Sequence, residues 1–262
     1  MGVPATTRST TPCVICGRTG EPSKEHVVGR RVRDALGTRG LVREYSGTTY
    51  VGGTEALAIV LHGVCVTCNR GWLEYLDRKA WSVLEPILLG AAAGTVRIID
   101  PADQAILAAW AVKVSLLLSL SKFRDQDNGW IPASTLDWLY RNHRSCMPPP
   151  GSRVWMGGLK TSDVPASVQV ACLTDGQDDP VAHCGTFSVG NVLFQVFCCE
   201  QKDSVLSLDN EIWLEPKGLY VPALLQIAPA VAPIRWPPEV VFTVDDLKPL
   251  AGRLQQGLPS RA

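Results

Sequence analysis

The sequence has no excess of charge of either sign. Lys and Arg together number 25, Asp and Glu also number 25, and charged residues make up only 19% of the 262 residues. This balance excludes the strong positive field by which highly basic proteins attract nucleic acids or anionic membranes over their whole surface. Residues 1–80 differ slightly, because they hold 11 basic and 7 acidic residues. The N-terminal third is therefore mildly basic.

Long uninterrupted apolar runs are also missing. The most apolar stretch, residues 105–120, is shorter than the roughly 20 residues that cross a bilayer and carries Lys113 near its middle. We therefore expect a buried helix there and no membrane partner. The first twelve residues lack the apolar centre of a signal peptide, and nine cysteines are an odd number for a secreted disulfide framework. These absences predict a cytoplasmic protein.

Apolar residues, in contrast, are plentiful at 46%, enough to bury one large core or two modest ones. Residues 1–80 hold 11 of the 23 glycines, residues 81–146 have helical patterns, and residues 147–262 have short β-type runs separated by Gly, Asp and Asn. The predicted fold is α+β, with an N-terminal domain, a helical region and a β-rich C-terminal region of unknown role. The helices are expected within residues 81–90, 101–120 and 133–143, and the strands within residues 152–159, 166–174, 184–199 and 211–216.

Four of the nine cysteines form two matching pairs. Cys13 and Cys16 make one CxxC motif, and Cys65 and Cys68 make a second after 48 residues. Four thiolates supply a closed tetrahedral shell for Zn²⁺, and a CxxC turn lets two sulfurs reach one ion. A redox CxxC or two disulfides are the alternatives, but two matching pairs favour structural zinc. Such a site contributes on the order of 10 kcal/mol to folding. The other five cysteines are expected to be buried apolar residues.

The segments CVICG, SKEHVVG and VCVTCNRGW resemble the zinc-bearing branch of the HNH, or His-Me finger, endonucleases. The resemblance covers about residues 12–80, and CNRGWLEYLD is similar to a bacterial group with a CNxGW motif and an uncharacterised C-terminal extension. It implies a ββα treble clef around the zinc and DNA as the partner. It also implies that His26 is the general base and that Glu25 and Asn69 hold a catalytic Mg²⁺ or Mn²⁺.

The residues themselves make this chemistry coherent. An imidazole with a pKa near 6.5 accepts a proton at physiological pH, and a hard cation offsets charge on a scissile phosphate. Asn69 follows Cys68 directly, so the zinc would fix its position. Plainer roles remain open: His26 as a hydrogen-bonded structural histidine, Glu25 as a solvated or helix-start carboxylate, and Asn69 as a helix N-cap.

Three arginines follow the histidine closely. Arg30, Arg31 and Arg33 suit phosphate contacts because the guanidinium group is a planar fork of donors, although a solvated helix face explains them equally well. Further along, Asp77 is expected on the solvated side of the helix after the second cysteine pair. Lys113 is expected to snorkel from its buried helix.

Two functions follow from these patterns. The first is a metal-dependent HNH endonuclease that hydrolyses DNA phosphodiester bonds, with residues 81–262 selecting the target or a protein partner. The second is a catalytically inactive zinc treble clef that binds nucleic acid or protein. It is consistent with two departures from the family pattern: only His62 stands where an asparagine is usual before the second CxxC, and no proline follows the histidine.

Overall fold

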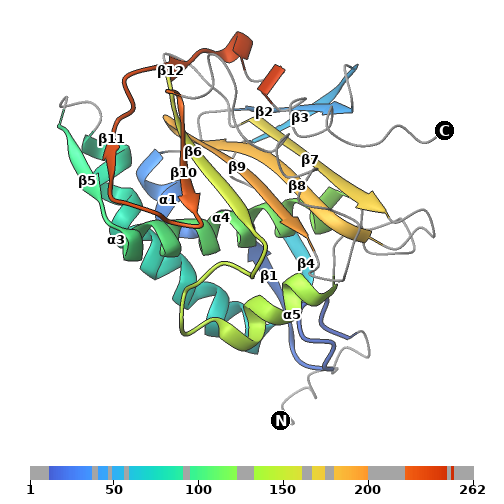
Figure 1. Cartoon of the computed structure of the whole chain (residues 1–262). Helices are drawn as coiled ribbons and strands as arrows, with labels where there is room; N and C mark the ends of the chain where they lie inside the picture. The colour runs from blue at the N-terminus through green and yellow to red at the C-terminus, as the bar shows by residue number, and fades with distance from the viewer. Residues whose placement is uncertain are drawn as a thin grey trace.

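The computed structural model describes residues 12–36, 41–46, 49–55, 59–90, 95–122, 133–160, 167–174, 180–199, 222–246 and 249–250. In this part of the chain, helices gather on one side of a large sheet, as Figure 1 shows. The fold is α+β, as predicted from the sequence. The predicted strand at residues 211–216 lies outside the described residues.

The large sheet has eight strands among the residues that the structure describes. Seven follow the order β10-β6-β9-β8-β7-β2-β3, and β12 also pairs with β6. The β7–β2 and β6–β12 pairs are parallel, and the other pairs are antiparallel. The strands are β2 (Leu41–Ser46), β3 (Thr49–Glu55), β6 (Arg153–Leu159), β7 (Ser167–Thr174), β8 (Pro180–Val189), β9 (Val192–Cys199), β10 (Leu224–Ala228) and β12 (Val241–Phe242).

Within the described ranges, four helices of seven or more residues lie beside this sheet (Figure 1). They are α1 (Arg30–Leu36), α3 (Glu74–Gly90), α4 (Pro101–Lys122) and α5 (Ala133–Asn142). The helix α4 packs against five strands of the sheet on one side and against α3 on the other. It is therefore the central layer of the molecule.

Sequence signals explain where α4 begins. Pro101 occupies its first position, and the Asp100 carboxylate accepts a hydrogen bond from the Asp103 backbone N–H at 2.8 Å. The segment 101–121 is the one helix in the described residues that is long and apolar enough to cross a bilayer, and 78% of that apolar stretch is buried within the fold. The prediction of a buried helix is confirmed, and α4 ends two residues beyond the predicted span of 101–120.

An aromatic cluster joins α4 to the sheet. Trp110 makes edge contacts with Phe187 and Phe194 at centroid distances of 6.2 and 5.6 Å, and the two phenylalanines stack at 5.3 Å. A second, smaller buried cluster includes Trp155 and Leu193, which alternate along their strands with residues of the main cluster. The central strands are therefore buried on both faces.

The remaining described strands form two small antiparallel sheets. The strand β1 (Pro22–His26) pairs with β4 (Val60–Cys65), and β4 leads into the short helix α2 (Val66–Cys68) and the π-helical turn η1 (Asn69–Leu73). The strand β5 (Arg97–Ile99) pairs with β11 (Ile234–Trp236). Near the end of the described residues, η5 (Val244–Asp246) is a single 3₁₀ turn.

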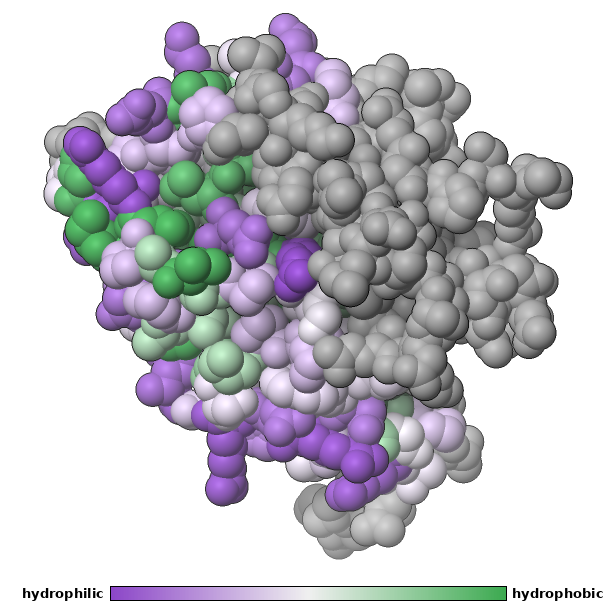
Figure 2. All heavy atoms as spheres, in the orientation of Figure 1, coloured by the Kyte–Doolittle hydropathy of each residue, from purple (hydrophilic) through white to green (hydrophobic). Residues whose placement is uncertain are grey.

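The β5–β11 ribbon has one buried and one exposed side. Ile99 and Trp236 are buried, whereas Ile98 is 66% exposed. Val96 and Val231 beside the ribbon are also exposed. Figure 2 shows apolar side chains gathered on the surface in the region where Figure 1 places β5 and β11. The ribbon thus adds apolar area to the surface as well as to the core.

The three regions predicted from the sequence share elements. The helix α3 crosses the boundary placed at residue 80. The strands β2 and β3 lie between the cysteine pairs, yet they extend a sheet whose other strands come from residues 153–242. One buried cluster contains side chains from all three regions, among them Val27, Trp110 and Phe194.

Candidate metal centre and the neighbouring polar cluster

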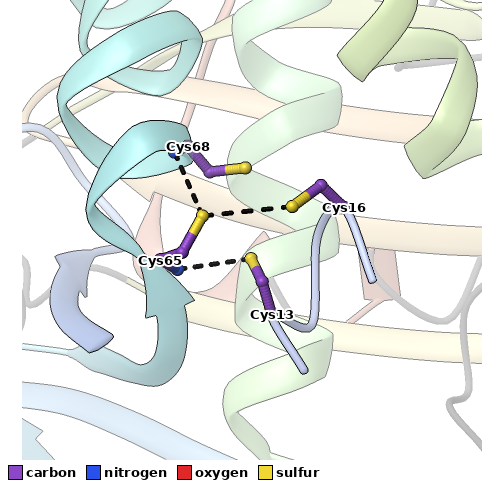
Figure 3. A group of neighbouring side chains, drawn as sticks. All are labelled: Cys13, Cys16, Cys65 and Cys68. Carbon is purple, nitrogen blue, oxygen red and sulfur yellow. Dashed lines mark hydrogen bonds between the residues drawn. The ribbon is translucent and has the colours of Figure 1, made fainter. Parts of the chain in front are cut away.

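The four paired cysteines meet at one end of the two-stranded β1–β4 sheet (Figure 3). The first pair lies in a turn before β1, which is closed by the Gly17 N–H donating to the Cys13 carbonyl at 2.8 Å. Gly17 has φ 68°, a conformation that favours glycine. The second pair spans the end of β4 and α2. Because Pro22 on β1 lies opposite Cys65 on β4, pairing of these strands brings the two cysteine pairs together.

The sulfur atoms have the arrangement of a metal site. All four Sγ atoms lie within 4.8 Å of one another, and those of Cys16 and Cys65 are 3.9 Å apart. A tetrahedral zinc ion with Zn–S bonds near 2.3 Å separates its sulfurs by roughly 3.8 Å. Cys13, Cys65 and Cys68 are buried and Cys16 is half-buried. The predicted four-cysteine cluster is confirmed. A small decrease in the longer Sγ–Sγ distances would let all four sulfurs bind one metal ion such as Zn²⁺.

The surroundings of the cluster favour negative charge on sulfur. Backbone N–H groups of Ile15 and Cys65 donate to the Cys13 sulfur at 3.4 and 3.3 Å, and that of Cys68 donates to Cys65 at 3.4 Å. A hydrogen bond from the Cys68 thiol, helped by backbone donors and opposed by burial, lowers the pKa of Cys13 to about 4. The same contact raises the pKa of Cys68. A metal ion would therefore meet a thiolate at Cys13 and displace the proton of the Cys68 thiol.

Asn69 binds β1 and not the end of its own helix. Its side-chain amide donates to the Ser23 hydroxyl and to the Lys24 carbonyl, both at 3.0 Å. The N-cap of α2 is Cys65, and Asn69 itself has helical backbone angles. Of the roles left open by the sequence, the described contacts therefore fit a fixed position beside β1 and not an N-cap.

His26 ends β1 and contacts α1. Its Nδ1 atom lies 3.1 Å from Nη1 of Arg33. A guanidinium group has donors only, so Nδ1 is the acceptor and a neutral ring carries its proton on Nε2. Burial, followed by the positive charges of Arg33, Arg30 and Lys113, lowers the pKa of His26. The imidazole is therefore neutral at physiological pH.

Glu25 has different surroundings from its neighbour His26, as the alternation of side chains along a strand requires. Its side chain is buried, and its Oε1 atom lies 3.3 Å from the Lys113 ammonium group. Burial raises the pKa of Glu25, and Lys113 opposes that shift. The strand thus turns the two predicted site residues toward different partners.

Buried Lys113 and half-buried Asp77 form an ion pair that the sequence did not predict. The ammonium group lies 3.0 and 3.1 Å from the two Asp77 oxygens, and Trp110 Nε1 donates to the same carboxylate at 2.9 Å. Burial would lower the pKa of Lys113, but Asp77 and Glu25 outweigh it and raise that pKa. The expectation that Asp77 is solvated and Lys113 snorkels is wrong, because each is the other's partner. A lysine within an apolar helix could have signalled a buried carboxylate.

The three arginines of α1 differ in their contacts. Arg30 and Arg31 are exposed, and the Arg30–Asp34 pair at 3.4 Å joins two well-solvated side chains. Such a pair contributes little to stability. Arg33 is half-buried, and its Nε atom has no hydrogen-bond partner among the described residues. Arg33 is thus the arginine that the fold brings to His26.

Comparison of the chain with protein-family models, with curated protein sequences and with solved structures finds no match in any of the three. The resemblance to the HNH endonucleases therefore depends on its sequence motifs. The structure adds the four-cysteine cluster and the contacts of His26, Glu25 and Asn69 with their neighbours.

Proposed function

We propose that the chain is a zinc-stabilised protein of the HNH type that binds nucleic acid at the surface formed by His26 and the arginines of α1. The observation that carries the proposal is the 3.1 Å contact between His26 and Arg33, next to the exposed Arg30 and Arg31. Guanidinium groups bind phosphate oxygens through paired N–H donors. A neutral imidazole with its proton on Nε2 adds another donor.

Zinc is the metal that the cysteine cluster suits best. Four sulfur ligands close the coordination shell, so the ion would have a structural and not a catalytic role. It would tie the turn before β1 to the start of α2, as the treble clef implied by the resemblance requires. Since Asn69 follows Cys68 and hydrogen-bonds to β1, the same ion would support the strand that carries His26.

The second metal implied by the resemblance fits the residues less well. Glu25 is 4% exposed and paired with Lys113, and Asn69 directs its amide nitrogen to Ser23 and Lys24. Of the two predicted ligands of Mg²⁺ or Mn²⁺, Glu25 and Asn69, this leaves the Asn69 side-chain carbonyl oxygen as the group free to bind the ion. We derive no step through such an ion. These contacts support binding without cleavage as the first candidate.

The endonuclease is the second candidate, and the neutral, half-buried imidazole of His26 favours it. A bound phosphate would compete with Nδ1 for the Arg33 guanidinium group. Once Arg33 turned to the phosphate, the Nδ1 lone pair could accept a proton from an attacking water molecule, as a general base does. Residues 81–262 would then support the site or select a target or protein partner.

The test measures binding of fluorescent DNA and RNA, in single and double strands, by anisotropy at several salt concentrations. Combined substitution of Arg30, Arg31 and Arg33 by Gln should weaken binding tenfold or more. It should also reduce the slope of log affinity against log salt by about 1 for each phosphate group that is no longer bound. Arg141→Gln is the matched control, because Arg141 is an exposed helix arginine paired with Asp137. Equal affinity of the triple variant and the parent would reject the proposal.

Cleavage separates the two candidates. Incubation of plasmid with zinc-loaded protein and Mg²⁺ or Mn²⁺ should leave it intact if the protein only binds. Cleavage that disappears in His26→Ala, with one zinc retained per chain, would establish the endonuclease instead.

A further inference from the structure

The Lys113 ammonium group is surrounded by oxygen atoms of three residues, Glu25, Val27 and Asp77, from two other segments of the chain. Oxygens of Asp77 on α3 are 3.0 and 3.1 Å away, Glu25 on β1 is 3.3 Å away, and the Val27 carbonyl after β1 is also 3.3 Å away. The lysine is 1% exposed. Few buried lysines persist without such partners, so these contacts keep the charge in place.

Two of these partners flank His26 in the sequence. Lys113 holds the side chain of Glu25 before the histidine and the backbone carbonyl of Val27 after it. The Val27 N–H in turn donates to the Ile59 carbonyl at 3.1 Å. The backbone at His26 is therefore fixed on both sides, and α4 supplies the fixing group although it is 86 residues away from Val27 in the sequence.

The third partner, Asp77, contacts the turn between His26 and α1. A Cβ atom on Gly29 would lie 2.7 Å from Asp77 Oδ2, so the carboxylate packs directly on this glycine. The Gly29 carbonyl accepts hydrogen bonds from the N–H groups of Val32 and Arg33 at 3.1 and 3.3 Å. The first turn of α1, and with it Arg33, is thus placed by the same ion pair.

We propose that Lys113 is a positioning residue for the His26 site. Its ammonium group, bound by Glu25, Asp77 and the Val27 carbonyl, sets the contact between His26 and Arg33 from inside the protein. The helix α4 is therefore part of the site and not an accessory to it. The importance of this contact for nucleic acid rests on the proposed function, but the contact itself can be measured without nucleic acid.

The experiment compares imidazole ¹⁵N chemical shifts of His26 in the parent and in the triple variant Lys113→Met, Glu25→Gln, Asp77→Asn. The triple variant removes all three charges of the cluster together, so no charge is left unpaired. The signal is assigned with His26→Asn, and metal content and circular dichroism confirm the fold. In the parent, the shifts should report an acceptor Nδ1 and a protonated Nε2. In the variant, Arg33 should move away from the ring. The Nδ1 shift should then move away from the value of a nitrogen that accepts a hydrogen bond from a guanidinium group.

His183 serves as the internal control, because it contacts the same helix through Ser115 at 2.6 Å and its signals should not move. Lys79→Met, which removes an exposed lysine on α3, should change neither histidine. Asp77→Asn alone is measured alongside, with a smaller change of the same sign expected. The proposal would be overturned if the triple variant or Asp77→Asn folds and its His26 shifts stay at the parent values. If the triple variant loses nucleic-acid binding while the His26 shifts stay unchanged, the positioning role of Lys113 is rejected and the proposed function is not.

Discussion

At the scale of single residues, Glu25 and His26 show how strand geometry assigns roles. They are adjacent on β1, yet one is paired with a buried lysine and the other with an arginine of α1. The motif suggested these residue types for a site, but the sequence did not show which way each side chain points. That direction depends on the partner strand β4 and on a helix far along the chain.

Gly29→Ala should destabilise the protein by about 1–3 kcal/mol, as overpacking of a buried site does. The added methyl group would meet the Asp77 carboxylate at 2.7 Å, and that carboxylate cannot move without leaving Lys113. Urea denaturation measures the change. Gly90→Ala is the control, because its nearest neighbour is an Arg97 side-chain atom at 3.7 Å. Equal unfolding midpoints for the two variants would contradict the close contact.

His183 should make the fold sensitive to acid. It is fully buried, with Ser115 at 2.6 Å from Nε2, and burial lowers its pKa to about 3. Below the ordinary value near 6.5 the unfolded chain takes up a proton that the folded chain does not, so stability is lost as the pH falls toward 3. The free energy of unfolding of the parent, relative to His183→Gln, should fall by about 1.4 kcal/mol per pH unit in this window. A difference that does not vary with pH would show that the imidazole charges within the fold.

At the scale of elements, local signals predicted α4, α5 and the strands β6, β7, β8 and β9, but not β2, β3, β5 or β10 to β12. Pro101 after Asp100 marked the start of α4, and Gly90 marked the end of α3. The CxxC spacing predicted the cysteine cluster because a metal ion imposes it. The sequence did not predict that Lys113 pairs with Asp77, since that contact depends on how α3 and α4 pack together.

Removal of one metal ligand should unfold the two-stranded β1–β4 sheet. In Cys65→Ser, bound zinc measured by mass spectrometry should fall from one ion per chain to none. The stability of the fold should fall by several kcal/mol, on the order of the 10 kcal/mol that a structural zinc contributes. Cys146→Ser is the control: this cysteine is buried but lies outside the cluster, and the variant should keep its zinc. Retention of the metal by Cys65→Ser would exclude the four-sulfur site.

At the scale of the whole molecule, the three regions predicted from the sequence depend on one another. Buried side chains of α3 pack against α4, and β2 pairs with β7 through Arg43 opposite Ser167. Composition and turn signals place the region boundaries where the sequence changes from a helical pattern to β-type runs. They could not reveal this interlocking, because pairing between distant strands leaves no local pattern in either one.

A fragment ending at residue 90 should therefore not fold as the intact chain does, even with zinc. It would expose Leu76, Leu84 and Ile87, which are buried in the full structure. Rapid proteolysis of the fragment, with poorly dispersed amide signals in its NMR spectrum, is the expected result. The full-length protein treated identically is the reference. A fragment as resistant as the parent would show that the N-terminal region is an independent domain.

The position of β2 and β3 between the cysteine pairs affects how the protein is made. Both cysteine pairs leave the ribosome long before β7. A metal ion can therefore close the loop between the pairs while β2 still lacks β7, its neighbour in the sheet. Closing the loop reduces the chain entropy that later docking must overcome. Until β7 emerges, however, the strand edge of β2 is open to pairing with other nascent chains. Early metal capture would then guide folding, and slow translation past this point would favour aggregation.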